Sequence, residues 1–197
     1  HPTCQAVLRD PAGSISGGGI FVVEALNANL AAFETEGVDL AIDYNMPMNF
    51  GLLSPESRLT FFFLGNYTRT NDFTPVVGVD DVIECAGAFG LNCGNPTPKY
   101  KFTTRVAWTD GPLTSTLRWR HVGSSVDDDE ETDFIVDELD DYNVFDLAFS
   151  VAPTDAYTIN FGINNLFDKR YYSMFSWYST YTWGEPRNMM LAVKYQF

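Results

Sequence analysis

The chain is built largely of runs of about ten residues in which apolar and polar side chains alternate. Side chains of a β-strand point to opposite faces in turn, so a period of two predicts strands rather than helices. The alternation is blurred only around Phe61-Phe62-Phe63-Leu64. Seven strands are predicted, at residues 38–46, 59–67, 100–108, 113–120, 144–151, 157–164 and 189–197.

The connections between these runs differ in length in a regular way. Short turns are predicted at 47–57, 109–112 and 152–156. Long loops are predicted at 74–98, 124–140 and 168–185, with another before residue 20. A meander with short turns at one end and long loops at the other is typical of an outer-membrane β-barrel. The short-turn end also carries the rings of a predicted interfacial girdle: Tyr44, Trp108, Tyr157 and Tyr195.

In such a barrel the apolar face of each strand contacts lipid and the polar face lines the lumen. The polar face carries basic residues that we expect to pair with carboxylates of a plug or to line the path of an anionic ligand. These predicted lumen-facing residues are Arg105, Arg118, Arg120 and Lys194. An antiparallel soluble sandwich shows the same alternation and remains an alternative. The unequal loops and the apolar terminal strand favour the membrane.

Charge and composition narrow the function further. The 197 residues carry a formal net charge of -14, which argues against a nucleic-acid partner. No apolar stretch approaches the roughly 20 residues of a transmembrane helix, and no secretory signal opens the chain. Ten of the 26 acidic residues fall in segment 126–141. Its Asp127, Asp128 and Asp129 are weak candidates for Ca²⁺ or for ion bridges to lipopolysaccharide, although a solvated loop is the commoner role of such a run.

The three cysteines indicate an oxidising compartment. Cys85 and Cys93 enclose a short segment with two glycines, a spacing that suits a disulfide-closed loop in a periplasm or at a cell exterior. A metal site is less favoured because both histidines lie elsewhere. Cys4 is left odd, and we expect its partner upstream of His1.

No catalytic constellation is present in the sequence. His1 and His121 stand alone, and there is no Gly-x-Ser-x-Gly elbow, phosphate-cradling glycine loop or Cys-x-x-Cys pair. We therefore expect a protein that is not an enzyme and needs no cofactor.

The aromatic loop between the last two predicted strands is the most suggestive binding segment. Its rings offer apolar faces together with hydroxyl and indole donors, which suit sugars or aromatic chelators. Packing against neighbouring strands, or an outer aromatic girdle, is the alternative role. The candidate ligand-binding residues are Tyr172, Trp177, Tyr178, Tyr181 and Trp183.

Three segments resemble one known family. Residues 162–172 read GINNLFDKRYY and are followed by a long loop and a strand that ends at Phe197. This combination is similar to the C-terminal signature of TonB-dependent outer-membrane receptors. Residues 29–40, with their ETEGVD core, resemble another strand of that family, and residues 84–101 resemble a cysteine-containing outer loop of one branch.

The resemblance implies an energy-coupled importer of a scarce nutrient such as a ferric siderophore, cobalamin or an oligosaccharide. It implies location in the outer membrane of a Gram-negative bacterium, with the long loops extracellular. The implied partners are lipid and lipopolysaccharide, a plug domain, the TonB complex and the outer-membrane assembly machinery. The resemblance also implies that this machinery reads Phe197 as an assembly signal.

The chain departs from the family in its size. Family barrels have about 22 strands around a plug, whereas about seven strands and no plug are found here. Residues 1–197 are therefore interpreted as a C-terminal segment of the receptor barrel, with the plug and the N-terminal strands absent from this chain. A small self-contained barrel acting as a pore or adhesin, and a soluble β-sandwich binding module, are the competing hypotheses.

Overall fold

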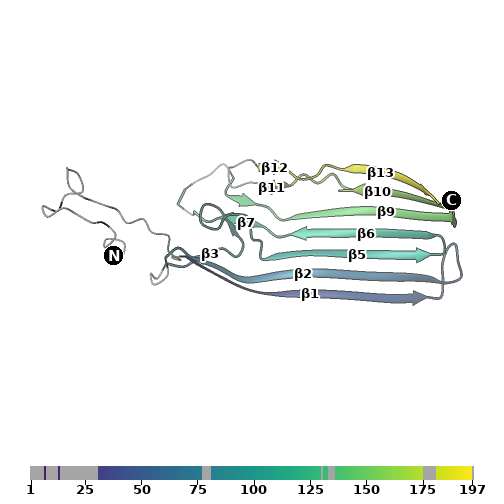
Figure 1. The fold of residues 1–197 in the computed structure, drawn as a ribbon, viewed down its shortest axis with the longest axis horizontal. Helices are drawn as coiled ribbons and strands as arrows, with labels where there is room; N and C mark the ends of the chain where they lie inside the picture. Colours follow the sequence, from purple (N-terminus) through teal and green to yellow (C-terminus); the bar gives the residue numbers. More distant parts are fainter. Residues whose placement is uncertain are drawn as a thin grey trace.

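The computed structural model describes residues 7, 13, 31–76, 81–129, 131–132, 136–174 and 181–196. An antiparallel sheet of seven long strands dominates it (Figure 1). The strands follow one another across the sheet in sequence order, as a meander. They are β1 (Ala32–Met48), β2 (Ser57–Thr74), β5 (Tyr100–Asp110), β6 (Leu113–Val122), β9 (Tyr142–Thr154), β10 (Tyr157–Asn164) and β13 (Asn188–Tyr195). The seven strands predicted from alternation are confirmed.

Shorter strands lie within the segments predicted as long loops. β3 (Ile83–Glu84) pairs with the far end of β2. A separate three-stranded sheet combines β4 (Ala88–Phe89), β7 (Ser125–Asp127) and β8 (Glu138–Leu139), and a hairpin combines β11 (Tyr172–Met174) with β12 (Tyr181–Trp183). In the part of the chain that is described, no helix is long and apolar enough to cross a membrane.

The short connections and the long ones lie at opposite ends of the sheet (Figure 1). Residues 49–56, 111–112 and 155–156 join strands at the short-turn end, and 75–99, 123–141 and 165–187 join them at the loop end. Residues 49–56 form the longest of the three short connections, and a residue of the neighbouring turn holds them in place. The buried carboxylate of Asp110 accepts the backbone N–H groups of Leu52, Leu53 and Ser54.

The register places apolar side chains on one face of the sheet across its whole width. Residues directly opposite one another in an antiparallel ladder share a face. One row of such residues crosses every long strand: Tyr44, Phe61, Val106, Leu117, Leu147, Ile163 and Met189. A row on the opposite face reads Asp43, Phe62, Arg105, Arg118 and Asp146. The lumen-facing basic residues predicted from sequence do share one face.

Within the part of the chain that is described, this apolar face is largely exposed. Leu191 and Val193 have exposed fractions of 69% and 64%, and Phe102, Leu147 and Phe161 are half-buried. Among the described residues, the buried hydrophobic side chains are Cys85, Ala88, Phe89 and Val144, none of which lies on that face. A soluble sandwich would bury these rows in a shared core, so the arrangement favours the membrane interpretation.

A bulge in the first strand pair marks where the apolar face ends. The ladder shifts between Glu36 and Gly37, with Arg69 as the extra residue of β2. On the loop side of the bulge, Glu34 and Glu36 lie on the same face of β1 as Val38. Meanwhile the stacked rings of Phe33 and Phe73, with centroids 4.6 Å apart, lie on the polar side. Carboxylates on this side indicate that the apolar face itself ends near the bulge.

Aromatic rings lie near both limits of the apolar band. At the short-turn end Tyr157 and Tyr195 have centroids 4.8 Å apart, and the Trp108 indole donates to Ser57 Oγ over 3.0 Å. At the loop end Tyr67 and Tyr100 stack at 5.0 Å. From Trp108 to Tyr100 the strand rises by about 26 Å, which a tilt of about 40° reduces to roughly 20 Å, most of the ~25 Å apolar band of an outer-membrane barrel.

We expect opposite responses from two neighbouring residues of β6. In the full-length protein, Leu117→Arg places a charge in the middle of the apolar face and should cost about 2–4 kcal/mol of unfolding free energy in a bilayer. Thr116→Arg, on the polar face one residue away, should cost much less. Urea titration of the protein in lipid vesicles measures both, and equal losses would contradict the assignment of the faces.

Candidate functional site

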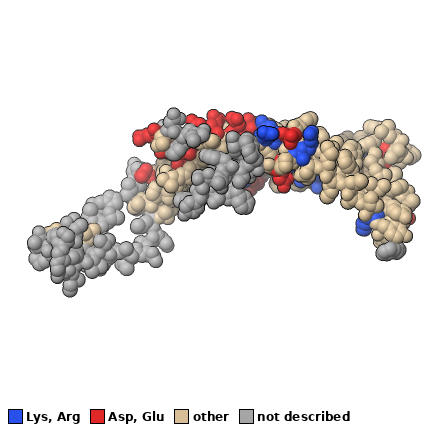
Figure 2. Space-filling model, turned by 90° about the horizontal axis from the view of Figure 1, so that it is seen from above, with Lys and Arg blue, Asp and Glu red and all other residues tan. Residues whose placement is uncertain are grey.

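The loop end of the sheet contains two hollows that share a pair of stacked rings. A hollow of about 380 Å³ lies among residues 95–98 (which follow the disulfide loop), the start of β9 and residues 169–171. A second of about 700 Å³ lies among residues of β2, β5 and β6. Both are lined by Val122, Tyr142 and Tyr171. In the view of Figure 2, Asp and Glu side chains gather over this end, and Lys and Arg side chains follow toward the strands.

The shared rings are held by packing from both sides. Tyr142 and Tyr171 stack with centroids 4.3 Å apart. Tyr171 also lies against Gly184, where an added Cβ would collide with the ring, and the N–H of Gly184 donates to the Tyr171 carbonyl over 2.8 Å. Any larger residue at 184 would displace the ring, so glycine is required there by close approach.

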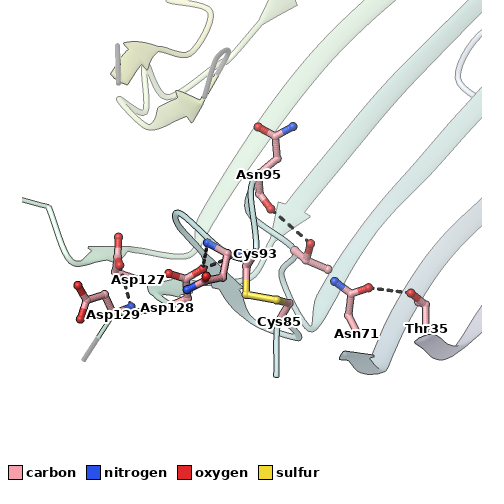
Figure 3. Close-up of a disulfide and its surroundings, with 10 residues drawn as sticks. Thr35, Asn71, Cys85, Cys93, Asn95, Asp127, Asp128 and Asp129 are labelled. Atoms are coloured by element: carbon pink, nitrogen blue, oxygen red, sulfur yellow. Dashed lines mark hydrogen bonds between the residues drawn. A yellow bond between two sulfur atoms is a disulfide. The ribbon is translucent and has the colours of Figure 1, made fainter. Parts of the chain in front are cut away.

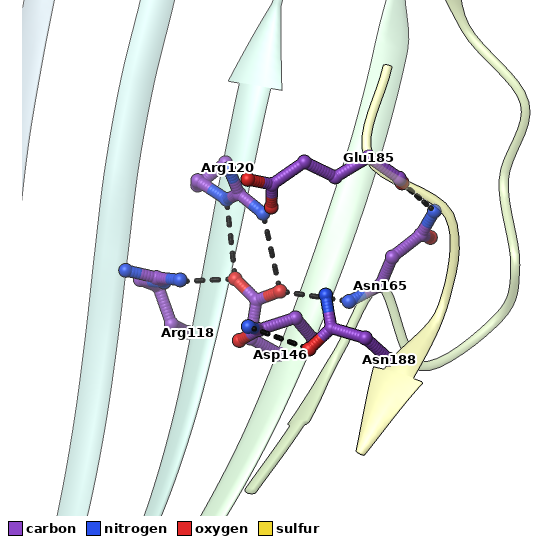
Figure 4. A network of polar contacts seen from close by, with 7 residues as sticks. Arg118, Arg120, Asp146, Asn165, Glu185 and Asn188 are labelled. Atoms are coloured by element: carbon purple, nitrogen blue, oxygen red, sulfur yellow. Dashed lines mark hydrogen bonds and ion pairs between the residues drawn. The ribbon is translucent and has the colours of Figure 1, made fainter. Parts of the chain in front are cut away.

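A buried carboxylate links the polar face of the sheet to the last long loop (Figure 4). Asp146 has an exposed fraction of 6% and accepts from Arg118 Nε at 2.8 Å and from Arg120 Nε and Nη2 at 3.1 Å. It also accepts from the backbone N–H of Asn165 at 2.9 Å. Arg118 and Arg120, two of the four predicted lumen residues, therefore have an anionic partner on the sheet itself. The cluster of two guanidinium groups and one carboxylate carries a net positive charge.

The other two predicted lumen residues have different surroundings. Arg105 lies directly opposite Arg118, and its guanidinium carbon is 5.4 Å from the centroid of the Phe62 ring. This contact explains how an aromatic residue is accommodated on the polar face of β2. Lys194 lies opposite Thr158 on the same face of the β10–β13 pair. That this face lines a lumen stays a prediction.

Asn165 gives the GINNLFDKRYY segment its shape. Its φ of 51° is in the left-handed region, which asparagine tolerates better than most residues. The side chain, 1% exposed, donates to the carbonyls of Lys169 and Glu185 at 2.9 and 3.0 Å and accepts from the Lys169 N–H at 2.9 Å. The two ends of the 165–187 loop are thereby held together. Asp168, at φ 54°, adds a bond from the Arg187 N–H at 3.1 Å.

The predicted disulfide between Cys85 and Cys93 is confirmed, with Cα atoms 5.3 Å apart (Figure 3). Asp128 holds this loop to the acidic segment, because its carboxylate accepts the N–H groups of Asn92 and Cys93 at 2.8 and 2.6 Å. The same carboxylate lies against Gly90. With the parallel pairing of β4 and β7, these contacts join the disulfide loop and the acidic segment into one structural unit.

The other two calcium candidates also accept backbone amides. Asp127 bonds the N–H of Asp129, and Asp129 bonds those of Glu131 and Thr132. The Thr132 hydroxyl and these amides hold the pKa of Asp129 below its ordinary value. Within the described residues, no group of three or more His, Cys, Asp or Glu side chains comes together as a metal site. Calcium binding stays a prediction from the sequence.

The remaining sequence candidates are located only in part. Trp177, Tyr178, Phe197 and Cys4 lie outside the described residues. The backbone of the aromatic loop forms the β11–β12 hairpin, in which Tyr172 is opposite Trp183 and Met174 is opposite Tyr181. Ligand contact by this loop stays a prediction.

Sequence reasoning missed three residues that organise the loop end: Tyr142, Asp146 and Asn165. The only signal for Asp146 was a carboxylate on a strand face that otherwise carries Val144, Ala148 and Ser150. Asn165 was noticed as part of a motif, but its contacts join residues up to 20 positions apart, which no local pattern indicates.

Comparisons with known proteins agree on one kind of protein. A family model described as TonB dependent receptor-like, beta-barrel, matches residues 6–166. The ferripyoverdine receptor of Pseudomonas aeruginosa is 34% identical over 58 residues, which are 29% of this chain and 7% of that receptor.

Two solved structures are similar in shape. The FpvAI–pyocin S2 complex matches 84% of this chain and 19% of the other, with a TM-score of 0.53 and 20% identity, and this likeness concerns the fold alone. P. aeruginosa FpvA bound to a heterologous pyoverdine matches 87% of this chain and 31% of the other, with a TM-score of 0.45 and 14% identity. The chain thus spans a small fraction of each relative.

We expect Asn165→Ala to open the 165–187 loop without unfolding the barrel. The change removes three hydrogen bonds of about 1 kcal/mol each and puts a poorly suited residue at a positive φ. In the purified full-length protein, trypsin cleavage after Lys169 and Arg170 should accelerate at least about tenfold, because cleavage follows the open population. Asn164→Ala, which loses one exposed hydrogen bond to Asn188, is the matched control. Equal cleavage rates in the two variants would contradict the anchoring role.

Proposed function

This chain belongs to the TonB-dependent receptor β-barrel family, and on that premise we propose that it is part of an outer-membrane receptor that imports a ferric siderophore with energy transmitted by TonB. The family consists of receptors and transporters of the Gram-negative outer membrane rather than enzymes. The single observation that carries the proposal is the family match over residues 6–166, which fits a sheet with one exposed apolar face.

We place residues 1–197 in the C-terminal part of a barrel of about 22 strands. In the described part of the chain, β1 and β13 each have one long neighbouring strand, so the sheet has two open edges. Unpaired backbone groups in lipid cost several kcal/mol each, so further strands are needed to close the barrel. Those strands and the plug would come from the remainder of the receptor.

The orientation follows from loop length and from the two faces. Outer-membrane barrels have short periplasmic turns and long extracellular loops, so the loop end lies outside the cell in this proposal. The polar face then lines the lumen, where Arg105, Arg118, Arg120 and Lys194 meet the plug or an anionic ligand. The net positive cluster around Asp146 supports this role. The apolar face contacts lipid, and the loop end reaches the lipopolysaccharide layer.

A ferric siderophore is the substrate class that we favour over cobalamin and oligosaccharides. The support is the match to a protein whose name specifies ferripyoverdine, together with the hollows at the loop end. The rings of Tyr172, Trp177, Tyr178, Tyr181 and Trp183 are our candidates for ligand contact. TonB would act through a segment outside this chain, and the outer-membrane assembly machinery would insert the barrel.

Uptake of ⁵⁵Fe by intact cells tests the proposal. Cells that produce the full-length receptor should accumulate iron supplied as a ferric siderophore, whereas cells lacking the receptor, or lacking functional TonB, should not. Radiolabelled cobalamin is supplied in parallel. Iron accumulation independent of the receptor, or receptor-dependent accumulation of cobalamin instead of iron, would overturn the substrate assignment.

Phe197 gives a separate prediction about assembly. Deleting this residue from the intact receptor should lower its amount in the outer membrane and leave the ligand affinity of the remaining molecules unchanged, because in this proposal the residue acts during insertion and not in ligand binding. Surface labelling measures the amount and equilibrium binding to cells measures the affinity. Unchanged surface abundance would count against the role.

A further inference from the structure

We propose that the smaller hollow at the loop end is a binding subsite for a zwitterionic, peptide-like group. It is lined by two carboxylates, Asp140 and Asp141, by two cations, Lys169 and Arg170, and by the stacked Tyr142 and Tyr171. The hollow was not a candidate at the level of sequence, because its walls come from segments far apart along the chain.

The two charged pairs are brought together by the tyrosine stack. Asp140 and Asp141 directly precede Tyr142, and Lys169 and Arg170 directly precede Tyr171. Since the rings lie 4.3 Å apart, the acidic and basic dipeptides flank the same cavity.

The opposite charges around the cavity do not neutralise one another. All four charged residues are exposed, and among the described residues no ion pair joins either carboxylate to either cation. From the described residues, Asp141 accepts a long hydrogen bond, 3.4 Å, from Asn143. A simple anion or cation would be attracted by one pair and repelled by the other. A group that carries both an ammonium and a carboxylate can satisfy both pairs, which makes a zwitterion the complementary ligand.

The third wall is rigid and partly apolar. Pro96 and Pro98 follow the segment closed by the disulfide, and backbone bonds of Thr97 with Gly87 and Ala88 at 2.6 and 3.1 Å hold them against that segment. Ser125 also lines the hollow, and its hydroxyl is buried without a hydrogen-bond partner.

The walls are positioned before any ligand arrives. Asn165 holds the Lys169 backbone, and Gly184 backs the Tyr171 ring. A volume of about 380 Å³ is at the small end of the range for ligand sites and suits a group of dipeptide size. Preorganisation of this kind lowers the ordering cost of binding.

Saturation-transfer NMR on the purified full-length receptor in detergent tests the subsite, with glycylglycine as the probe. Glycylglycine should show saturation transfer, and uncharged N-acetylglycinamide should show about tenfold less, since charge-assisted hydrogen bonds are lost. The double variants Asp140→Asn/Asp141→Asn and Lys169→Gln/Arg170→Gln should each reduce the glycylglycine signal to a similar extent.

A matched control lies in the same acidic segment. Asp137→Asn/Glu138→Gln removes two charges from residues that do not line this hollow, and it should leave the signal unchanged. The proposal is overturned if the neutral probe gives an equal signal or if the pocket variants behave like the control. Iron uptake reports separately on the transporter. If glycylglycine binds but iron uptake fails, the proposed function is wrong and the subsite stands. If iron uptake succeeds but glycylglycine does not bind, the subsite is wrong and the proposed function stands.

Discussion

Everything else in this structure depends on a single hydrogen-bonded ladder with one apolar face. Seven strands are joined edge to edge, and among the described residues only four hydrophobic side chains are buried. A sheet in water must cover such a face with a second layer. Here the face ends at the bulge near Gly37 and at aromatic rings near the turns, which are the limits that a lipid bilayer would set.

The long loops are held by buried polar groups instead of a hydrophobic core. Asp128 ties the acidic segment to the disulfide loop, and Asn165 joins the two ends of the last loop. Asp146 connects that loop to Arg118 and Arg120 on the polar face. An anion that approaches these arginines from inside a barrel would compete with the Asp146 carboxylate for them. Because Asp146 also accepts the Asn165 N–H, this competition would affect the residue that holds the loop. The polar face of the sheet and the loop end are therefore electrostatically connected.

The strands were predictable because a sheet with one apolar and one polar face requires an apolar side chain at every second residue. Their lengths were less predictable: β1 begins at Ala32 instead of 38, and β2 extends to Thr74 instead of 67. Beyond the bulge the outward side becomes acidic, so the apolar alternation no longer marks the strand. The blurred pattern at Phe62 has a tertiary cause, since Arg105 on the neighbouring strand covers its ring.

The amino-acid sequence by itself determined the strands, their order, the face each side chain takes and the Cys85–Cys93 pairing, because these depend on local periodicity and short spacings. Only the tertiary structure decided which residues meet at the loop end. Tyr142 stacks on Tyr171, and Asp146 reaches Asn165, through pairings between segments about 20 to 30 residues apart. Contacts of that range depend on strand register and loop closure, and neither leaves a periodic trace in the chain.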